Sequence, residues 1–357
     1  MKHILTCDGG GIRGIFALQL IQRIETLLRE HYGRPNLVLA DHYDFFAGTS
    51  TGAIIATCLC LGMSTEKILD FYLKGGRAMF LNASFTKRFI LARYDSHPLT
   101  QQLKEVFVED DGSLSLLSSK KLRKLLLVVT RNATTGSHWP VTNNPLAKYN
   151  DVNSPHCNLN VPLWQLVRAS TAAPTFFPAE TVLLGDQQFV FVDGAVTAYN
   201  NPALLAITNA ILPYFRICWP VGPEQIRLIS IGTLRFGSSS GRKSAEQLGW
   251  ADAIISVPNS LMDSSAAQQD MICRTMGKCL YGAPLDSEVG DMCQEDGLPK
   301  MFSYVRYNES YRAKAILDLQ KKYGKQIRRI DSIDSIPALS EIGREYAQKH
   351  VRLEHLI

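Results

Sequence analysis

Ser50 stands between two glycines, where an apolar run ends and a helix-like run begins. Residues 48–52 read Gly-Thr-Ser-Thr-Gly, after Phe-Phe-Ala and before Ala-Ile-Ile-Ala. A serine on such a strand-to-helix turn is held in a strained backbone with its hydroxyl exposed. Gly48 and Gly52 leave room for the tight turn and for a substrate. The pattern therefore predicts a nucleophile and one class of reaction, acyl transfer.

Three consecutive glycines, Gly9, Gly10 and Gly11, form a second motif with Arg13. They follow a strand candidate at 3–7 and open a run with apolar residues at helical spacing. Unpaired N–H groups at a helix N-terminus favour negative charge, either an oxyanion on an attacked carbonyl or a phosphate. The loop alone does not choose between the two. Arg13 could orient this loop through a carboxylate or face a lipid phosphate.

Asp193 and Gly194 form the third motif. They follow the apolar residues Gln-Phe-Val-Phe-Val at 188–192, which predict a buried strand. Asp193 would then lie at the carboxyl end of a strand, where open α/β sheets gather their reactive groups. Gly194 lets another group approach closely, so the Asp193 carboxylate could take the proton from Ser50.

These motifs, in this order, resemble the patatin-like phospholipase family. Its pattern combines a DGGGxRG loop, a GxSxG nucleophile and a DGA or DGG aspartate. Residues 168–178, 200–202 and 229–233 are similar to further landmarks of the family, so the resemblance covers about residues 1–235. It implies a Ser–Asp dyad without histidine, a phospholipid or lysophospholipid substrate, and no cofactor or metal, so that activity is independent of calcium.

The resemblance implies a mechanism in which Ser50 attacks an ester carbonyl and Asp193 accepts its proton. The N–H groups of Gly10 and Gly11, with Gly9 nearby, would hold the oxyanion. Water would then hydrolyse the acyl-Ser50 intermediate. Because a free aspartate has a pKa near 3.9 and is a poor base, burial must raise the pKa of Asp193.

Strand and helix patterns alternate through the first 235 residues. Strands are predicted at 2–7, 36–47, 125–130, 188–193 and 226–231, with helices at 13–32, 51–62, 64–79, 162–169 and 202–212. This alternation predicts an α/β fold with a mostly parallel sheet and helices on both faces. We expect one domain over 1–357, with a motif-bearing core at 1–235 and a helical C-terminal layer at 236–357. That layer would follow a Gly/Ser stretch at 237–241 and a capping box formed by Ser244 and Gln247.

The composition, with 46% hydrophobic and 20% charged residues, is that of an ordinary globular protein. No apolar run reaches the roughly 18–20 residues that span a bilayer. The first strand candidate begins at His3, which leaves no room for a signal peptide, so we expect a cytoplasmic protein that meets the inner face of the membrane. The eight cysteines show no CxxC spacing, which predicts buried free thiols and no metal site.

The net charge of +5 is mild. Basic clusters at 120–124 and 321–329 are either solvated faces or contacts for anionic lipid headgroups. No nucleic-acid motif accompanies them, so we expect no nucleic acid partner. The length, early first strand and helical C-terminal layer also resemble bacterial patatin-like effectors of antiphage defence. That resemblance implies activation by a cyclic dinucleotide, for which the basic residues at 321–329 are candidates.

Two rival interpretations use the same residues. The spacing of glycines at 9, 11 and 14 also fits a dinucleotide-binding fingerprint, with Asp41 after an apolar run for a ribose contact. Such an oxidoreductase would have no use for Ser50 and Asp193. An α/β-hydrolase triad would add His350 or His355 to Ser50 and Asp193. Both histidines, however, fall in a polar stretch that predicts a solvated helix.

Overall fold

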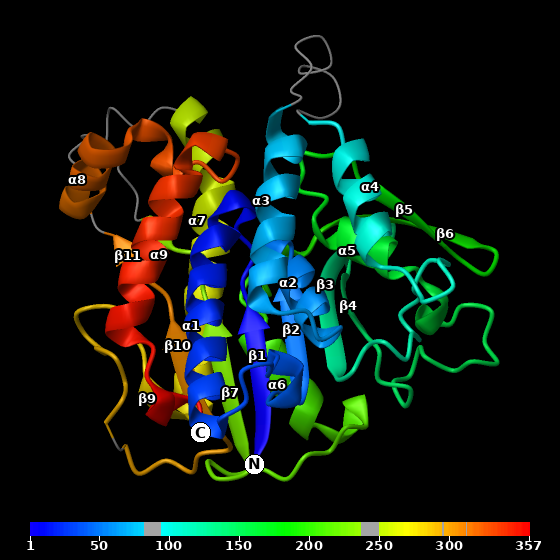
Figure 1. The fold of residues 1–357 in the computed structure, drawn as a ribbon, viewed down its shortest axis with the longest axis horizontal. Coiled ribbons are helices and arrows are strands. Elements are labelled where there is room, and N and C mark those ends of the chain that lie inside the picture. Colours follow the sequence, from blue (N-terminus) through cyan, green and yellow to red (C-terminus); the bar gives the residue numbers. More distant parts are fainter. Residues whose placement is uncertain (82–93, 237–249, 295, 312) are drawn as a thin grey trace.

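A computed structural model describes residues 1–81, 94–236, 250–294, 296–311 and 313–357. Its main sheet runs through the centre of the molecule (Figure 1). In that sheet each strand is hydrogen-bonded to the next in the order β5 (Glu180–Leu184), β6 (Gln187–Asp193), β3 (Leu125–Asn132), β2 (Phe45–Thr49), β1 (Lys2–Cys7), β7 (Ile226–Ile231), β10 (Ser303–Tyr307) and β9 (Lys278–Tyr281). From β3 to β9 the strands are parallel, whereas β5, β6 and β4 (His138–Thr142) pair antiparallel. A separate pair joins β8 (Arg235–Phe236) to β11 (Ser310–Tyr311).

Helices cover both faces of the sheet. Successive side chains of a strand point to opposite faces, and the central strands carry apolar side chains on both, so each face must be covered. In β1, Leu5 belongs to one hydrophobic cluster and Ile4 to another. The Leu5 cluster takes in α1 (Gly14–Tyr32), α2 (Thr51–Cys60), α3 (Thr65–Leu81), α4 (His97–Val106), α5 (Leu163–Ser170), α8 (Ala313–Tyr323) and α9 (Ile336–His350). The Ile4 cluster takes in α6 (Ala203–Ile211) and α7 (Trp250–Met276).

The predicted fold class is confirmed, with differences in particular elements. The apolar run at 36–47 forms a short 3₁₀ helix at Leu39–Asp41, and β2 begins only at Phe45. Residues 236–357 supply the helices α7, α8 and α9, but they also supply β9 and β10, which the sequence analysis did not predict. The Gly/Ser stretch and the capping box lie outside the described residues. Within the described ranges, no helix is both long and apolar enough to cross a membrane.

Strand β3 brings the ends of β2 and β6 together. Residues 127–129 of β3 pair with both β2 and β4, and residues 130 and 131 pair with both β6 and β4. Because β4 occupies one edge of β3 at all these residues, β2 and β6 share the other edge. Thr49, the last residue of β2, pairs with Val129, and Asp193, the last residue of β6, pairs with Thr130. Because β6 runs antiparallel to β3, the two strands meet end to end. Ser50, which follows β2, therefore lies next to Asp193.

Candidate active site

Ser50 sits on a sharp turn between β2 and α2. Its backbone has φ 55° and ψ −124°, a region that non-glycine residues rarely adopt. Its N–H donates to the Ser170 hydroxyl at 2.9 Å. The turn is so tight that a Cβ on Gly48 would lie 2.1 Å from the carbonyl oxygen of Gly52. The strained conformation agrees with the sequence pattern, and the glycines permit it.

The Ser50 hydroxyl is not exposed, which corrects the expectation from the sequence. Ser50 is 8% exposed, and its Oγ donates to Asp193 Oδ2 at 2.7 Å. The other carboxylate oxygen of Asp193 accepts the N–H of Ala195 at 2.7 Å. A Cβ on Gly194 would lie 2.3 Å from the Val129 carbonyl oxygen, so the chain after Asp193 packs directly on β3.

The Asp193 carboxyl is 2% exposed, and burial raises its pKa to about 7. Three groups oppose that shift because they stabilise the ionised form: the Ala195 N–H, the Ser50 hydroxyl and the Arg168 guanidinium. A carboxylate with a pKa near neutrality can accept a proton from a serine hydroxyl far better than a solvated aspartate can.

The glycine loop lies beside this pair, and its N–H groups differ in what they bond. The Gly9 N–H donates to the Asn200 carbonyl at 3.1 Å, and the Thr233 hydroxyl donates to the Gly9 carbonyl at 2.7 Å. Among the described residues, neither Gly10 N–H nor Gly11 N–H has an acceptor. Gly11 has φ 58°, which favours glycine. Within the described chain, Gly10 and Gly11 thus offer donors to an oxyanion, whereas the N–H of Gly9, the third candidate, is already bonded.

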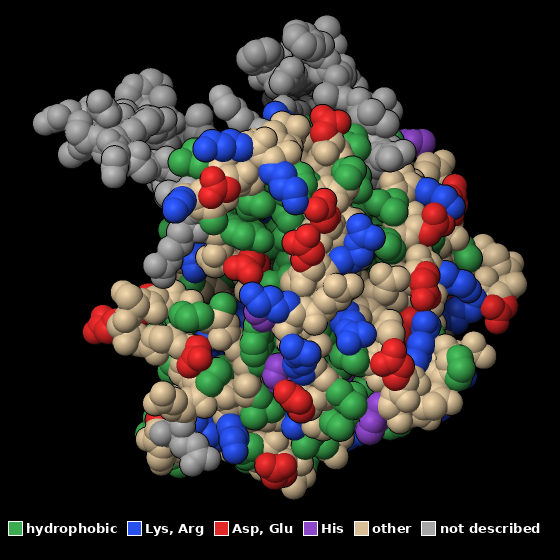
Figure 2. Space-filling view, turned by 60° about the vertical axis from the view of Figure 1, so that its left-hand side comes forward, with side chains coloured by type: hydrophobic (Ala, Val, Ile, Leu, Met, Phe, Trp, Pro, Cys, Tyr) green, Lys and Arg blue, Asp and Glu red, His purple; other side chains and the backbone are tan. Residues whose placement is uncertain are grey.

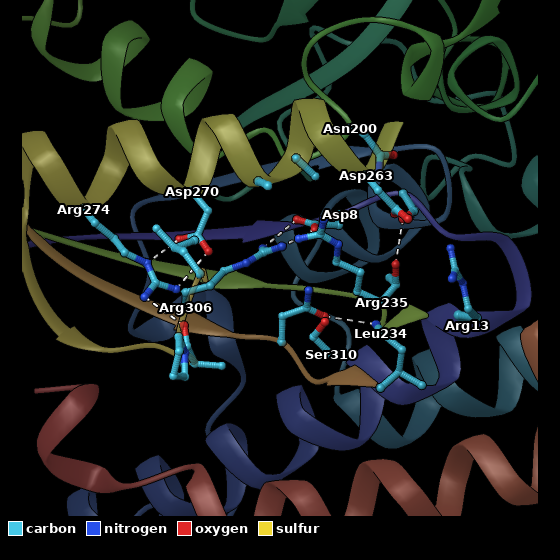
Figure 3. Close-up of a pocket in the computed structure, with 18 residues that line it drawn as sticks. Asp8, Arg13, Asn200, Leu234, Arg235, Asp263, Asp270, Arg274, Arg306 and Ser310 are labelled. Carbon is cyan, nitrogen blue, oxygen red and sulfur yellow. Dashed lines mark hydrogen bonds and ion pairs between the residues drawn. The ribbon is translucent and has the colours of Figure 1, made fainter. Parts of the chain in front are cut away.

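The Arg13 side chain contacts the backbone of the glycine loop. Its Nε donates to the Gly10 carbonyl at 3.4 Å, a long bond. Burial lowers the pKa of Arg13, while the carboxylates of Asp263 and Asp8 oppose that shift. Figure 3 shows Arg13 and Asp263 at the same end of a cavity. Arg13 was expected either to orient the loop through a carboxylate or to face a lipid phosphate. The structure shows that Arg13 contacts the loop, but it bonds a carbonyl oxygen rather than a carboxylate.

That cavity, of about 70 Å³, adjoins Gly9 (Figure 3). Two buried ion pairs line it. Arg306 Nη1 donates to Asp8 Oδ1 at 2.9 Å, and Arg274 Nε donates to Asp270 Oδ1 at 2.9 Å. Arg306 lies on β10 and Asp8 follows β1, so the first pair joins the glycine loop to the C-terminal part of the chain.

Comparison of the sequence with known proteins identifies the family of this chain. The model of the family described as patatin-like phospholipase matches residues 5–207, more than half of the chain. The chain belongs to that family. A cGAMP-activated phospholipase of Vibrio cholerae is 29% identical over 248 residues, 65% of this chain and 64% of the relative. Patatin-T5 of Solanum tuberosum is 29% identical over 252 residues, 65% of this chain and 60% of the relative.

The chain therefore covers less than two thirds of these curated relatives' own length. Among solved structures, VipD from Legionella pneumophila aligns with 96% of this chain and 67% of its own, at 13% identity and a TM-score of 0.37. A similarity this low supports no argument.

Neither histidine of the rival triad bonds the carboxylate in this patatin-like chain. His350 Nδ1 and the Tyr281 hydroxyl lie 2.7 Å apart, as do His355 Nδ1 and the Tyr307 hydroxyl. Both histidines are partly buried. His350 ends α9, which packs against α1, and His355 lies in the 3₁₀ turn that follows, so this stretch is not the fully solvated helix that was predicted. The oxygens of Asp193 bond Ser50 and Ala195 instead.

The acidic residue of the rival fingerprint has other partners. Asp41 ends a 3₁₀ helix rather than a strand, and it forms ion pairs with Arg34 and Arg123. It is therefore not placed as a ribose-binding acid at a strand end. Within the described parts of the chain, no group of three or more His, Cys, Asp or Glu side chains could hold a metal ion.

Three positioning residues escaped the sequence analysis although they lie in segments that resemble the family. Ser170 fixes the Ser50 N–H and donates to the Val129 carbonyl, while Asn200 and Thr233 fix Gly9. The signal that could have found Ser170 and Thr233 was the presence of hydroxyl residues in those segments, at 168–178 and 229–233. Asn200 acts through its backbone carbonyl, which leaves no signal in the sequence.

Charged side chains of both signs alternate over the face shown in Figure 2. Members of the predicted C-terminal basic cluster pair with carboxylates, Lys322 with Glu341 at 3.0 Å and Arg329 with Asp331 at 2.9 Å. The Lys322 pair is exposed and contributes little to stability, whereas Asp331 is buried beneath Arg329. Both carboxylates reduce the positive charge that a phosphate would meet. This cluster is therefore weaker as an anion site than its sequence predicts.

Proposed function

We propose that this protein hydrolyses carboxylic esters of membrane phospholipids or lysophospholipids through an acyl-Ser50 intermediate. The observation that carries the proposal is the 2.7 Å contact between Ser50 Oγ and a buried Asp193 carboxylate, on a turn with φ 55°. Membership of the patatin-like phospholipase family supports the choice of substrate class.

In the proposed mechanism, Ser50 Oγ attacks the ester carbonyl as its proton passes to Asp193 Oδ2. The developing oxyanion is held by the free N–H groups of Gly10 and Gly11, each worth about 2.7–4 kcal/mol of barrier lowering. Asp193 then protonates the leaving alcohol, which departs as a lysolipid or glycerol derivative. Water enters and attacks the acyl carbonyl as it loses a proton to Asp193. The bond to Ser50 Oγ then breaks, the fatty acid leaves, and Asp193 returns the proton to Ser50 Oγ. No step uses a metal ion, so we expect activity to survive chelation of calcium.

Fatty-acid release from mixed phospholipid vesicles tests the proposal. The wild-type chain should release fatty acid, and both Ser50→Ala and Asp193→Asn should abolish release while remaining folded. A chain with His350→Ala and His355→Ala is the matched control and should remain active. Release that survives in Ser50→Ala would overturn the nucleophile assignment.

We further propose that a cyclic dinucleotide activates this hydrolysis at the inner face of the cell membrane. The support is the alignment of 65% of this chain with a relative named as a cGAMP-activated phospholipase. The vesicle assay, run with and without a panel of cyclic dinucleotides, tests this regulation separately from the chemistry. Full activity without nucleotide, together with no thermal stabilisation by any member of the panel, would overturn activation and leave the dyad intact.

A further inference from the structure

Two cysteines, Cys279 and Cys293, lie side by side near Arg274, one of the residues that line the cavity. Cys279 is on β9, the edge strand of the sheet, and Cys293 is in the connection that leads from β9 to β10. They are 14 residues apart in sequence, and their Sγ atoms are 3.5 Å apart. The sequence predicts buried free thiols for all eight cysteines, because none of them shows CxxC spacing.

The geometry holds the two sulfurs in one place. Both contact the carbonyl oxygen of Asp291, Cys279 Sγ at 3.7 Å and Cys293 Sγ at 3.6 Å. A disulfide needs its sulfurs about 2.05 Å apart, so the side chains must close by about 1.5 Å. Cys293 lies on a connection outside the strands, so its movement breaks no pairing of the sheet.

The two thiols differ in reactivity. Cys279 is 5% exposed, whereas Cys293 is partly exposed. The hydrogen bond with Cys279 lowers the pKa of the Cys293 thiol, and the nearby Arg274 guanidinium adds to that effect. The same hydrogen bond, together with burial, raises the pKa of Cys279. Because the thiolate is the nucleophile, Cys293 is the sulfur that reacts first with an oxidant from solution.

We propose that Cys279 and Cys293 form a redox-active pair that a peroxide converts into an intramolecular disulfide. The Cys293 thiolate attacks hydrogen peroxide, the O–O bond breaks, and the departing hydroxide takes up a proton as water. Cys293 is now a sulfenic acid. Cys279 attacks its sulfur, the S–O bond breaks, and the hydroxide leaves as water with the Cys279 proton. Two thiols are oxidised by two electrons in total, and one peroxide is reduced to two waters.

The disulfide would restrict the movement of the β9–β10 connection, which lines one side of the cavity at residues 283–285. Arg274 Nη1 already donates to two carbonyls of the β9–β10 connection, Ala283 O at 3.0 Å and Asp291 O at 2.7 Å. Figure 3 shows Arg274 at the end of the cavity opposite Arg13. A bond from Cys293 to Cys279 would tie this connection to the edge strand as well. The inference does not depend on the proposed hydrolysis.

Peptide mapping of the full-length folded protein tests the proposal. After treatment with hydrogen peroxide and alkylation of the remaining thiols, a cross-linked peptide pair containing Cys279 and Cys293 should appear, and dithiothreitol should remove it. Cys218, an exposed free cysteine, serves as the internal reference for a thiol that reacts with peroxide on its own. Continued alkylation of Cys279 and Cys293 after Cys218 has been oxidised would overturn the proposal.

Two serine variants separate the roles of the pair. In Cys279→Ser, Cys293 should accumulate as a sulfenic acid that dimedone traps, because no resolving thiol remains. In Cys293→Ser, Cys279 should stay reduced at the same peroxide dose. Cys218→Ser is the control and should form the cross-link normally. Over-oxidation of Cys293 to the sulfinic acid in the wild-type chain without any cross-link would contradict the assignment of Cys279 as resolving thiol, whatever the variants do.

Discussion

Asp193 and Asp8 are both buried aspartates at the ends of strands, yet they bond to different kinds of group. Asp193 is 2% exposed and bonds a hydroxyl and a backbone N–H. Asp8 is 4% exposed and accepts two hydrogen bonds from the Arg306 guanidinium. Burial raises the pKa of both carboxyls, but at Asp8 the cation opposes that shift directly.

The difference shows that burial alone does not make a carboxylate reactive. With a bidentate guanidinium, the charge of Asp8 is neutralised, and the pair joins β1 to β10 as a structural contact. With only neutral donors bonded to it, Asp193 keeps a proton affinity near neutrality, which a general base requires.

The largest effect is expected on turnover. Under the proposed function, Asp193→Asn should lower kcat on the order of 10⁴-fold, because an amide cannot accept the serine proton. The variant should still unfold in one cooperative transition at no lower urea concentration than the wild type. Hydrolysis of a soluble chromogenic ester, followed beside urea unfolding, measures both. A loss smaller than about tenfold would mean that another group is the base.

Asp8→Asn should damage the fold instead. It leaves the Arg306 charge buried without its carboxylate, which should lower the free energy of unfolding by about 3–5 kcal/mol. The matched control replaces both partners, Asp8→Leu with Arg306→Met, and should recover much of that loss. Urea unfolding at neutral pH is the measurement. If the double variant is as unstable as Asp8→Asn, the unpaired charge is not the cause.

Removing the Asp193 charge should stabilise the protein. Because burial raises the pKa of Asp193 from 3.8 to about 7, its contribution to stability is complete below pH 3.8 and is lost as pH rises to 7. The advantage of Asp193→Asn should therefore grow between pH 4 and pH 7 and then level off. Three pKa units correspond to at most about 4 kcal/mol. An advantage that does not change with pH would contradict the raised pKa.

The pH dependence of catalysis should report the same group. In the proposed mechanism, the base must be ionised, so kcat/KM should fall about tenfold per pH unit below pH 7 and be flat above it. Initial rates with the soluble ester between pH 5 and pH 9 test this. A midpoint near pH 4 would show that Asp193 titrates like a solvated carboxyl.

The smallest effect is expected at Ser170, which touches neither oxygen of the carboxylate. Ser170→Ala removes the acceptor of the Ser50 N–H and should lower kcat about tenfold with little change in KM, because the turn is held less firmly. Ser170→Thr keeps a hydroxyl and should retain more activity. An equal loss in both variants would indicate a packing defect rather than a lost hydrogen bond.

Sequence patterns predicted the parts of the fold that are built locally. The first strand and helix, and the strand–turn–helix around Ser50, follow from periodicity and glycine placement over short stretches. The strand predicted at 36–47 is confirmed only at its end, where β2 begins at Phe45. The earlier residues include a 3₁₀ helix, because a short apolar segment packs equally well in either form. Its buried side chains serve the core in either form.

What the sequence could not predict depends on pairing between distant segments. The antiparallel orientation of β6, the strands β9 and β10, and the contact of Asp8 with Arg306, 298 residues away, leave no periodic signal in the chain. Ser50 and Asp193 were named from their motifs, but the bond that occupies the Gly9 N–H involves Asn200 and became visible only in the fold. Local sequence patterns therefore identify the candidate site residues more reliably than they identify the partners of those residues.

The end-to-end meeting of β2 and β6 along β3 has an evolutionary consequence. Asp193 and Thr49, the residue before Ser50, pair with neighbouring residues of one strand, Thr130 and Val129. This pairing sets the distance between Ser50 and Asp193, which are 143 positions apart in sequence. Insertions or deletions in the connecting segments can therefore accumulate without changing the distance between the two side chains. A shift of β3 by one residue, in contrast, would displace the ends of both strands by about 3.3 Å. Homologues should accordingly diverge most in the connections and least in β3.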